Sequence, residues 1–217
     1  MKVLIFAKEK PGFENAVNFI KLYADDITIF RGNLNEPFPK EAYKKTPDIL
    51  ISYISPWIIP EKMLNLVKKW SINIHPGPPK YPGIGCTNFA IYNKEEIFGV
   101  TAHLMDTKVD SGKIIDVKRF PLLKEDTVLS LTERCYNYIL IQFYEVIGYL
   151  FKTNKLPECK ESWKRKPYTR KELNALCKID INMDHNEIKR RIRATDYPGM
   201  PGAYIDLKGL KFKYAKK

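Results

Sequence analysis

The chain has 217 residues, of which 44% are hydrophobic and 29% charged, and its formal net charge is +12. This length and apolar content suffice for one full domain with a buried core and a smaller appendage. No stretch approaches the roughly 18 apolar residues of a membrane span, the first apolar run is too short for a secretory signal, and the four cysteines lack metal-ligand spacing. We therefore expect a cytoplasmic protein with reduced thiols, no membrane partner and no metal site.

Hydrophobic periodicity predicts the elements of an α/β sheet in chain order. Predicted strands cover residues 2–7, 26–30, 47–52, 72–75, 100–105 and 113–120, and predicted helices cover 13–24, 61–69, 86–92 and 127–151. Strands alternating with helices favour a mostly parallel sheet flanked by helices. The turn at 8–12 contains one glycine and lacks the dinucleotide-binding fingerprint, so a nicotinamide cofactor is not expected.

The positive charge is concentrated in the last third of the chain. Residues 1–150 contain 19 Lys and Arg against 17 Asp and Glu, a net charge of +2, whereas residues 151–217 contain 18 against 8, a net charge of +10. A basic segment of this kind suggests a polyanionic substrate, either a nucleoside diphosphate or RNA. A solvated basic surface without a ligand is the alternative.

The charge shift and Pro157 divide the chain into a main domain at 1–156, a linker at 157–180 and a small extension at 181–217. The linker contains the basic run 163–170, which we interpret as a tether, with contact to nucleic-acid phosphates as the alternative. A short helix at 187–193 and a hairpin of 203–207 with 210–214 are predicted in the extension. The hairpin has an apolar, open edge, which suggests a homodimer surface or a cap on the domain.

Three polar side chains are predicted to converge at one edge of the sheet. Asn73 and His75 alternate with isoleucines at the end of a strand that Pro76 cannot continue, so both point the same way. Asp110 ends the polar loop after the next strand and is free to approach His75. A neutral His can take a proton, an Asp can fix its tautomer, and an Asn amide can donate to an oxygen that gains charge, which together suit acyl transfer. A single His on a strand is, by contrast, most often structural.

The motifs at 73–77 (NIHPG), 99–106 (GVTAHLMD) and 110–115 (DSGKII) resemble those of the folate-dependent formyltransferase family. The resemblance covers about residues 49–120 and implies a Rossmann-like catalytic domain that moves a formyl group from N10-formyltetrahydrofolate to an amine. It places Asn73, His75 and Asp110 on the catalytic positions of the family. The run 193–198 and the hairpin are similar to the short C-terminal extension of nucleotide-sugar N-formyltransferases.

The resemblance also implies where the two substrates bind. The folate pterin would lie against Ser55, Trp57 and Ile58 and against the loop before the catalytic Asp, at Asp106 and Thr107. Trp57 and Ile58 could equally serve only to fill the core. Lys80 follows His75 by five residues and could reach a substrate phosphate, and we assign Lys80 and its neighbour Tyr81 to substrate binding.

We therefore expect an N-formyltransferase acting on a nucleotide-linked amino-deoxysugar, most simply a dTDP-linked sugar with its amine at carbon 3 or 4, in lipopolysaccharide O-antigen biosynthesis. One alternative is a methionyl-tRNA formyltransferase, although the tail is too short for the β-barrel domain of those enzymes. A second alternative is a non-catalytic nucleotide- or RNA-binding module that shares the fold.

Overall fold

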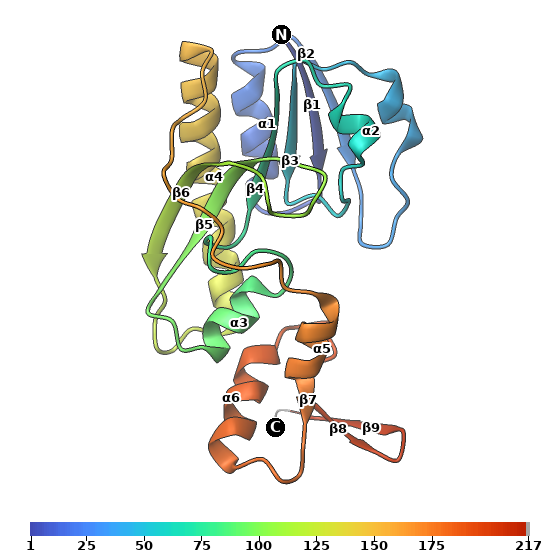
Figure 1. Ribbon diagram of the computed structural model, residues 1–217, viewed down its shortest axis with the longest axis vertical. Coiled ribbons are helices and arrows are strands. Elements are labelled where there is room, and N and C mark those ends of the chain that lie inside the picture. Colours follow the sequence, from blue (N-terminus) through green and yellow to red (C-terminus); the bar gives the residue numbers. More distant parts are fainter. Residues whose placement is uncertain (216–217) are drawn as a thin grey trace.

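The main body of the protein is a six-stranded sheet with helices on both faces (Figure 1). The computed structural model describes residues 1–215. Along the order β2-β1-β3-β4-β5-β6, the first four strands are parallel and β5 and β6 each run antiparallel to the strand before them. The strands are β1 Lys2–Ala7, β2 Asp26–Arg31, β3 Ile49–Tyr53, β4 Trp70–His75, β5 Ile97–Leu104 and β6 Ile114–Pro121. The prediction of a mostly parallel α/β sheet is confirmed.

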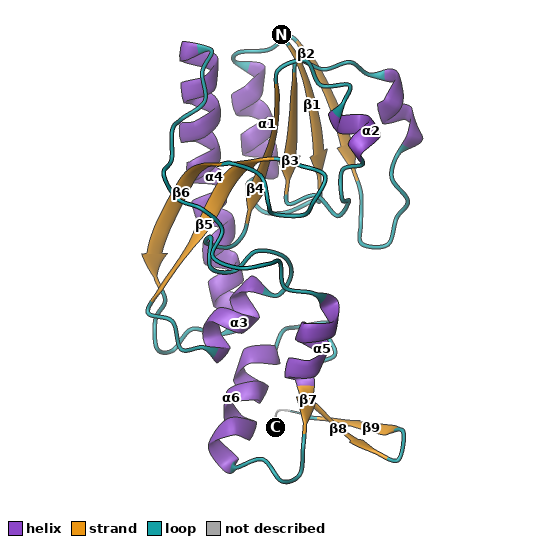
Figure 2. Ribbon diagram, in the orientation of Figure 1, coloured by secondary structure: helices purple, strands orange, loops and turns teal. Residues whose placement is uncertain are grey.

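Helices cover the two faces of this sheet unequally (Figure 2). One face packs on α1 (Phe13–Lys21), α3 (Cys86–Tyr92) and α4 (Val128–Thr153), and the other on the short η1 (Lys40–Lys44) and α2 (Glu61–Leu64). Strands β1 and β3 are therefore buried on both sides, which is why they read as continuous apolar runs and not as alternating ones. In β1, for example, Val3 and Ile5 enter the larger core and Leu4 and Phe6 the smaller one.

Helix α4 is the longest element and supports the sheet beneath β4, β5 and β6. Its buried side chains recur at helical spacing and include Leu131, Ile139, Phe143 and Ile147. A reciprocal cap fixes its first turn, because Thr127 Oγ1 accepts from the Ser130 N–H at 3.1 Å and Ser130 Oγ accepts from the Thr127 N–H at 3.0 Å.

The C-terminal part forms a separate small layer beyond α3 (Figure 1). It contains α5 (Arg170–Cys177), β7 (Lys178–Ile179), α6 (His185–Thr195), β8 (Tyr204–Leu207) and β9 (Leu210–Lys213). The predicted helix and hairpin are present, and the hairpin extends into a three-stranded sheet because β8 also pairs with β7. Residues 216–217 of the predicted extension lie outside the described residues.

Arginines of α6 hold this layer together and attach it to the rest of the chain. Arg190 and Arg191 both pair with Glu187, and Arg190 also lies over the Tyr92 ring of α3 at 4.2 Å. Arg191 also donates to the backbone carbonyls of Ala175 and Lys178. Arg193 donates to those of Lys124 and Asp126. These positive charges hold α6 in place.

Two sequence expectations differ from the structure. The helix expected at 61–69 stops at Leu64, because the Lys68 and Lys69 N–H groups bond to the carbonyls of Pro47 and Asp48 and the chain turns into β4 two residues earlier than expected. The segment 157–180, expected as a linker, contains α5 and β7, and its role as a linker stays a prediction.

Within residues 1–215, no helix is both long and apolar enough to cross a membrane, and no group of three His, Cys, Asp or Glu side chains is arranged to hold a metal ion.

Replacing Thr127 with Ala should lower the free energy of unfolding by about 1 kcal/mol, because the first turn of α4 loses its cap. Thr127→Asp retains a side-chain acceptor and should stay close to the wild-type value. Urea titrations of the three proteins would measure both changes. Equal losses in the two variants would show that the cap contributes nothing.

Candidate active site

The predicted polar side chains meet where β4 ends beside β5. In the antiparallel register of these strands, Asn73 lies opposite His103 and His75 opposite Thr101. The loop between β5 and β6 returns over this end and brings Asp110 against both histidines. His75, His103 and Asp110 are 3%, 2% and 7% exposed, so their charges interact with little screening by water.

The Asp110 carboxylate is the centre of this cluster. Its Oδ2 lies 3.1 Å from His75 Nδ1 and accepts from the Gly83 N–H at 2.7 Å. Its Oδ1 lies 3.2 Å from His103 Nε2 and accepts from the Asn73 amide at 3.5 Å. Burial would raise the pKa of Asp110, but His75, His103 and Gly83 favour the charged form and lower the pKa to about 2. The carboxylate is ionised at neutral pH.

His75 is protonated in this resting site. The Tyr81 carbonyl can only accept and lies 2.9 Å from Nε2, while the ionised Asp110 faces Nδ1, so both ring nitrogens have acceptors. Burial would lower the pKa of His75, but Asp110, assisted by Cys86 and the Tyr81 carbonyl, raises it to about 9. In this state the imidazolium is a hydrogen-bond donor at both ring nitrogens.

His103 joins the site although it was not among the residues predicted from the sequence. Its Nδ1 donates to the Leu104 carbonyl at 2.8 Å, and its Nε2 lies 3.0 Å from the Asn73 amide nitrogen. The alternating pattern around His103 contained the signal, since a His directly opposite Asn73 on a neighbouring strand has to share its environment. Trp163, whose ring lies edge-on to both histidines, had no such local signal.

A cavity of about 290 Å³ opens beside the cluster. Asn73, His75, His103 and Asp110 form one wall, and the loops after β3 and β5 form the others. Its remaining lining includes four of the five predicted donor-site residues, Ser55, Trp57, Ile58 and Asp106. Thr107 does not line the cavity, although its N–H donates to the Asp106 carboxylate at 2.6 Å.

Trp57 both supports the cavity and belongs to the core. Its Nε1 donates to the Glu36 carbonyl at 3.0 Å, and its ring packs edge-on against Phe6 in the smaller core. Ile58 is 72% exposed and Val109 is 41% exposed, and both line the cavity. Apolar walls with a few polar groups suit a flat heteroaromatic ring.

Lys80 and Tyr81 do not line this cavity. Lys80 Nζ pairs with Glu95 at 2.6 Å, and the Tyr81 hydroxyl donates to the same carboxylate at 2.6 Å. The Tyr81 ring is 1% exposed and contacts the site only through its carbonyl on His75. The structure therefore does not bring these two predicted substrate residues to the cavity, and their role stays a prediction.

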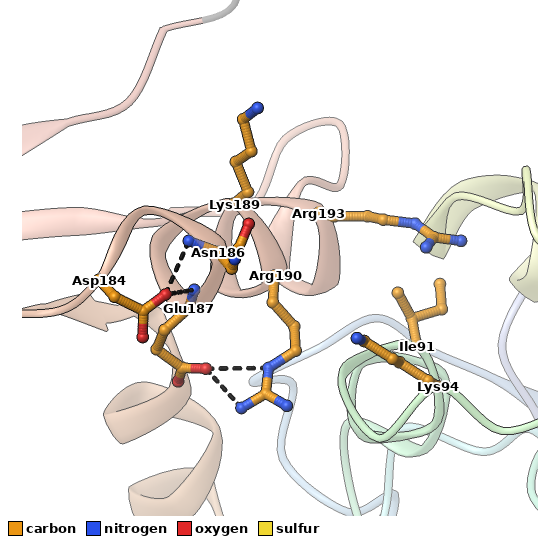
Figure 3. A pocket seen from close by; sticks show the side chains of 8 residues that line it. All are labelled: Ile91, Lys94, Asp184, Asn186, Glu187, Lys189, Arg190 and Arg193. Atoms are coloured by element: carbon orange, nitrogen blue, oxygen red, sulfur yellow. Dashed lines mark hydrogen bonds and ion pairs between the residues drawn. The ribbon is translucent and has the colours of Figure 1, made fainter.

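A larger cleft, of about 590 Å³, lies between α3 and α6 and contains none of the predicted site residues (Figure 3). Its carboxylates already have partners, because Asp184 accepts from the N–H groups of Asn186 and Glu187, and Glu187 pairs with Arg190. It presents charged side chains without an acid, base and oxyanion donor side by side. The smaller cavity is the one whose wall contains the cluster of Asn73, His75, His103 and Asp110.

Residues 31–146, more than half of the chain, match the formyl transferase family. The chain belongs to this family. It is 32% identical over 164 residues to a GDP-perosamine N-formyltransferase of Brucella melitensis, a match that covers 75% of this chain and 62% of that relative. The chain thus spans less than two thirds of the length of the curated relative it matches.

The fold of this formyl transferase family member is also that of solved sugar N-formyltransferases. The structure of a sugar N-formyltransferase from a Shewanella species superposes with a TM-score of 0.78 at 22% identity, covering 99% of this chain and 96% of that one. A second structure, WlaRD, described as a sugar 3N-formyl transferase in the presence of dTDP and 5-N-formyl-THF, gives 0.74 at 26% identity, covering 97% and 84%.

The ion pair of His75 and Asp110 predicts how stability depends on pH. The pKa of His75 is raised from 6.5 to about 9, so its contribution is complete below pH 6.5 and disappears as pH rises through 9. The pKa of Asp110 is lowered from 3.8 to about 2, so its contribution is lost as pH falls through that interval. In urea titrations, the wild type should lose on the order of 3 kcal/mol between pH 6.5 and 9 relative to His75→Gln.

The exposed His185 of α6 supplies the control, and His185→Gln should follow the wild-type curve. Parallel curves for the wild type and His75→Gln across this pH range would exclude a folded-state ion pair.

Proposed function

We propose that this chain is a sugar N-formyltransferase, which transfers the formyl group of N10-formyltetrahydrofolate to the amine of a nucleotide-linked amino-deoxysugar. The observation that carries the proposal is the buried cluster of Asn73, His75, His103 and Asp110 on the wall of an apolar cavity. It has support from the family and from the printed names of the relatives, which act on GDP-perosamine in one case and were studied with dTDP and 5-N-formyl-THF in another.

The proposed reaction exchanges one carbon–nitrogen bond for another. The neutral sugar amine attacks the formyl carbon, its bond to the folate N10 breaks, and the proton that the amine loses is transferred to the leaving nitrogen. Negative charge gathers on the formyl oxygen between these steps, and hydrogen-bond donors placed at that oxygen lower the barrier. The side chains of Asn73 and His75 are the donors on this wall of the cavity.

Each side chain of the cluster has a proposed role. The His75 imidazolium donates to the developing oxyanion, for which its Nε2 exchanges the Tyr81 carbonyl for the substrate oxygen. Asn73 donates from its amide to the same oxygen. Asp110 keeps His75 protonated and oriented, and as a carboxylate on the cavity wall it is assigned the relay of the proton between the two nitrogens.

The folate pterin is proposed to occupy the cavity beside Trp57 and Ile58. The volume of about 290 Å³ lies at the low end of the range for ligand pockets and fits the pterin end of the molecule. The exposed apolar side chains there supply surface that a ring would cover. The remainder of the folate and the nucleotide would lie outside this cavity.

The relatives differ in the nucleotide that their names carry, so the nucleotide and the position of the amine remain to be assigned by experiment. A panel of GDP- and dTDP-linked 3- and 4-aminosugars should be incubated with N10-formyltetrahydrofolate and analysed by mass spectrometry. At least one sugar should gain a formyl group. If no sugar is formylated while charged initiator tRNA is, the acceptor in the proposal is wrong.

Substitution of His75 by Ala should lower kcat by roughly 10²-fold or more, because a positioned acid–base group contributes about that much. Binding of the folate donor should persist, since the walls at Trp57 and Ile58 remain. Steady-state kinetics and a titration with 5-formyltetrahydrofolate would separate the two effects. His185→Ala, on the exposed side of α6, is the matched control and should keep the wild-type kcat. More than a tenth of wild-type turnover in His75→Ala would remove His75 from the mechanism.

The pH dependence distinguishes a donor from a base at position 75. If His75 acts as the imidazolium, kcat/KM should fall as pH rises through about 9, the pKa of this group. In Asp110→Asn this alkaline limb should move to lower pH, because the carboxylate that raises the pKa of His75 is gone. An alkaline limb that stays at the same pH in Asp110→Asn would contradict this role of His75.

A further inference from the structure

The segment expected to be a tether lies directly over the site. After α4 the chain returns along β6, where Glu161 forms two hydrogen bonds with Arg119, at 2.7 and 2.5 Å. It then crosses the loop that follows His75 and enters α5. We call residues 161–168 the strap, and its contacts with the site are backbone and aromatic contacts more than contacts of its basic side chains.

Two adjacent strap residues bond to both loops that carry the proposed catalytic groups. Trp163 Nε1 donates to the Gly112 carbonyl at 2.9 Å, two residues after Asp110. The Lys164 N–H donates to the Pro79 carbonyl at 2.9 Å, four residues after His75. One dipeptide therefore joins the two loops that the cluster must hold in register.

The end of the strap fixes the Gly83 N–H, which is a hydrogen-bond donor to the cluster. Tyr168 pairs with Gly83, its N–H donating to the Pro82 carbonyl at 2.8 Å and its carbonyl accepting from the Ile84 N–H at 3.2 Å. The Gly83 N–H is the one that donates to Asp110. Gly83 has φ +86, and a Cβ there would lie 2.4 Å from the Tyr168 carbonyl oxygen, so glycine is required for this close approach.

The Trp163 ring also closes one side of the cluster. Its centroid lies 5.1 Å from that of His103 and 5.7 Å from that of His75, and both contacts are edge-on. An aromatic wall keeps water away from the histidines and from Asp110, and a low dielectric strengthens the ion pair. Trp163 is itself half-buried.

We propose that Trp163 is a positioning residue for the formyl transfer, holding the turn of Asp110 and the loop of His75 in their relative geometry from the strap. This inference rests on the proposed function. The turn needs such support because Asp110 has φ +43, a left-handed conformation that a non-glycine residue adopts only when its surroundings hold it there. Trp163 does not line the cavity, and it acts through Asp110 and the two histidines.

The one arginine of the strap is engaged within the protein. The Arg165 guanidinium stacks on the Tyr168 ring at 3.2 Å and pairs with Glu172 of α5 at 2.7 Å. The Tyr168 ring stacks in turn on Phe89 of α3 at 3.8 Å. Arg165 therefore uses its charge to fix the end of the strap.

Kinetics of two variants test the proposal. Trp163→Phe keeps an aromatic wall but loses the N–H, and should lower kcat about fivefold, the size expected for one lost hydrogen bond. Trp163→Ala loses the wall as well, and should lower kcat roughly 10–100-fold, because small displacements of positioned groups are costly. KM for the folate donor should stay within about twofold, since Trp163 does not line the cavity. A kcat of Trp163→Phe that lies between those of the wild type and Trp163→Ala would separate the effect of the aromatic wall from that of the hydrogen bond.

The matched control is Trp70→Phe. Trp70 is also half-buried, but it begins β4 at the end opposite His75, so its replacement should leave kcat unchanged. Wild-type kcat in Trp163→Ala, or an equal loss of kcat in Trp70→Phe, would overturn the positioning role.

A fluorescence titration tests the strap without any substrate. A protonated imidazole quenches a neighbouring indole more strongly than a neutral one, so the emission that Trp163 contributes, taken as wild type minus Trp163→Phe, should rise as pH passes through about 9. The rise should be absent in His75→Gln. No rise in the wild type would contradict the contact, whatever the formyl-transfer assay gives. A rise without formyl transfer to any amine would instead refute only the proposed function.

Discussion

The site depends on one buried carboxylate. Asp110 accepts hydrogen bonds from one loop and two strands, and a carboxylate this deeply buried is stable only while its partners are in place. Its charge keeps His75 protonated, which changes the chemistry available at the cavity from proton abstraction to donation. Geometry, protonation and local stability are therefore three results of the same ion pair.

The sheet topology explains why these groups can meet at all. In the four parallel strands, the end of β4 lies with the other carboxyl-terminal strand ends. The switch to the antiparallel β5 sets His103 opposite Asn73. A parallel β5 would have needed a crossover connection, and the loop that carries Asp110 would have emerged elsewhere. The order of strands thus selects which loop covers the end of β4 that carries the cluster, and α4 packs beneath β4, β5 and β6.

Much of the fold could be predicted from local patterns, whereas part of the site could not. The apolar runs of β1 and β3 and the helical spacing in α4 reflect the burial of each element, and such patterns can be recognised in the sequence alone. Asn73, His75 and Asp110 lie in short motifs and could be predicted as a group. Their protonation depends on burial and could not be predicted. Trp163 lies 51 residues from its partner Gly112, and the basic composition around it indicated a tether. Contacts of that range are visible only once the chain is folded.

The arginines of α6 show what a formal charge does and does not measure. Arg190, Arg191 and Arg193 contribute to the +10 of the last 67 residues, yet their guanidinium groups are engaged with Glu187 and with backbone carbonyls of α5 and of the turn before α4. Cations engaged in this way stabilise the packing of the layer. The positive potential at the protein surface is therefore weaker than the composition suggests. A strongly basic segment can accordingly owe its composition to the assembly of its own layers, with no anionic partner involved.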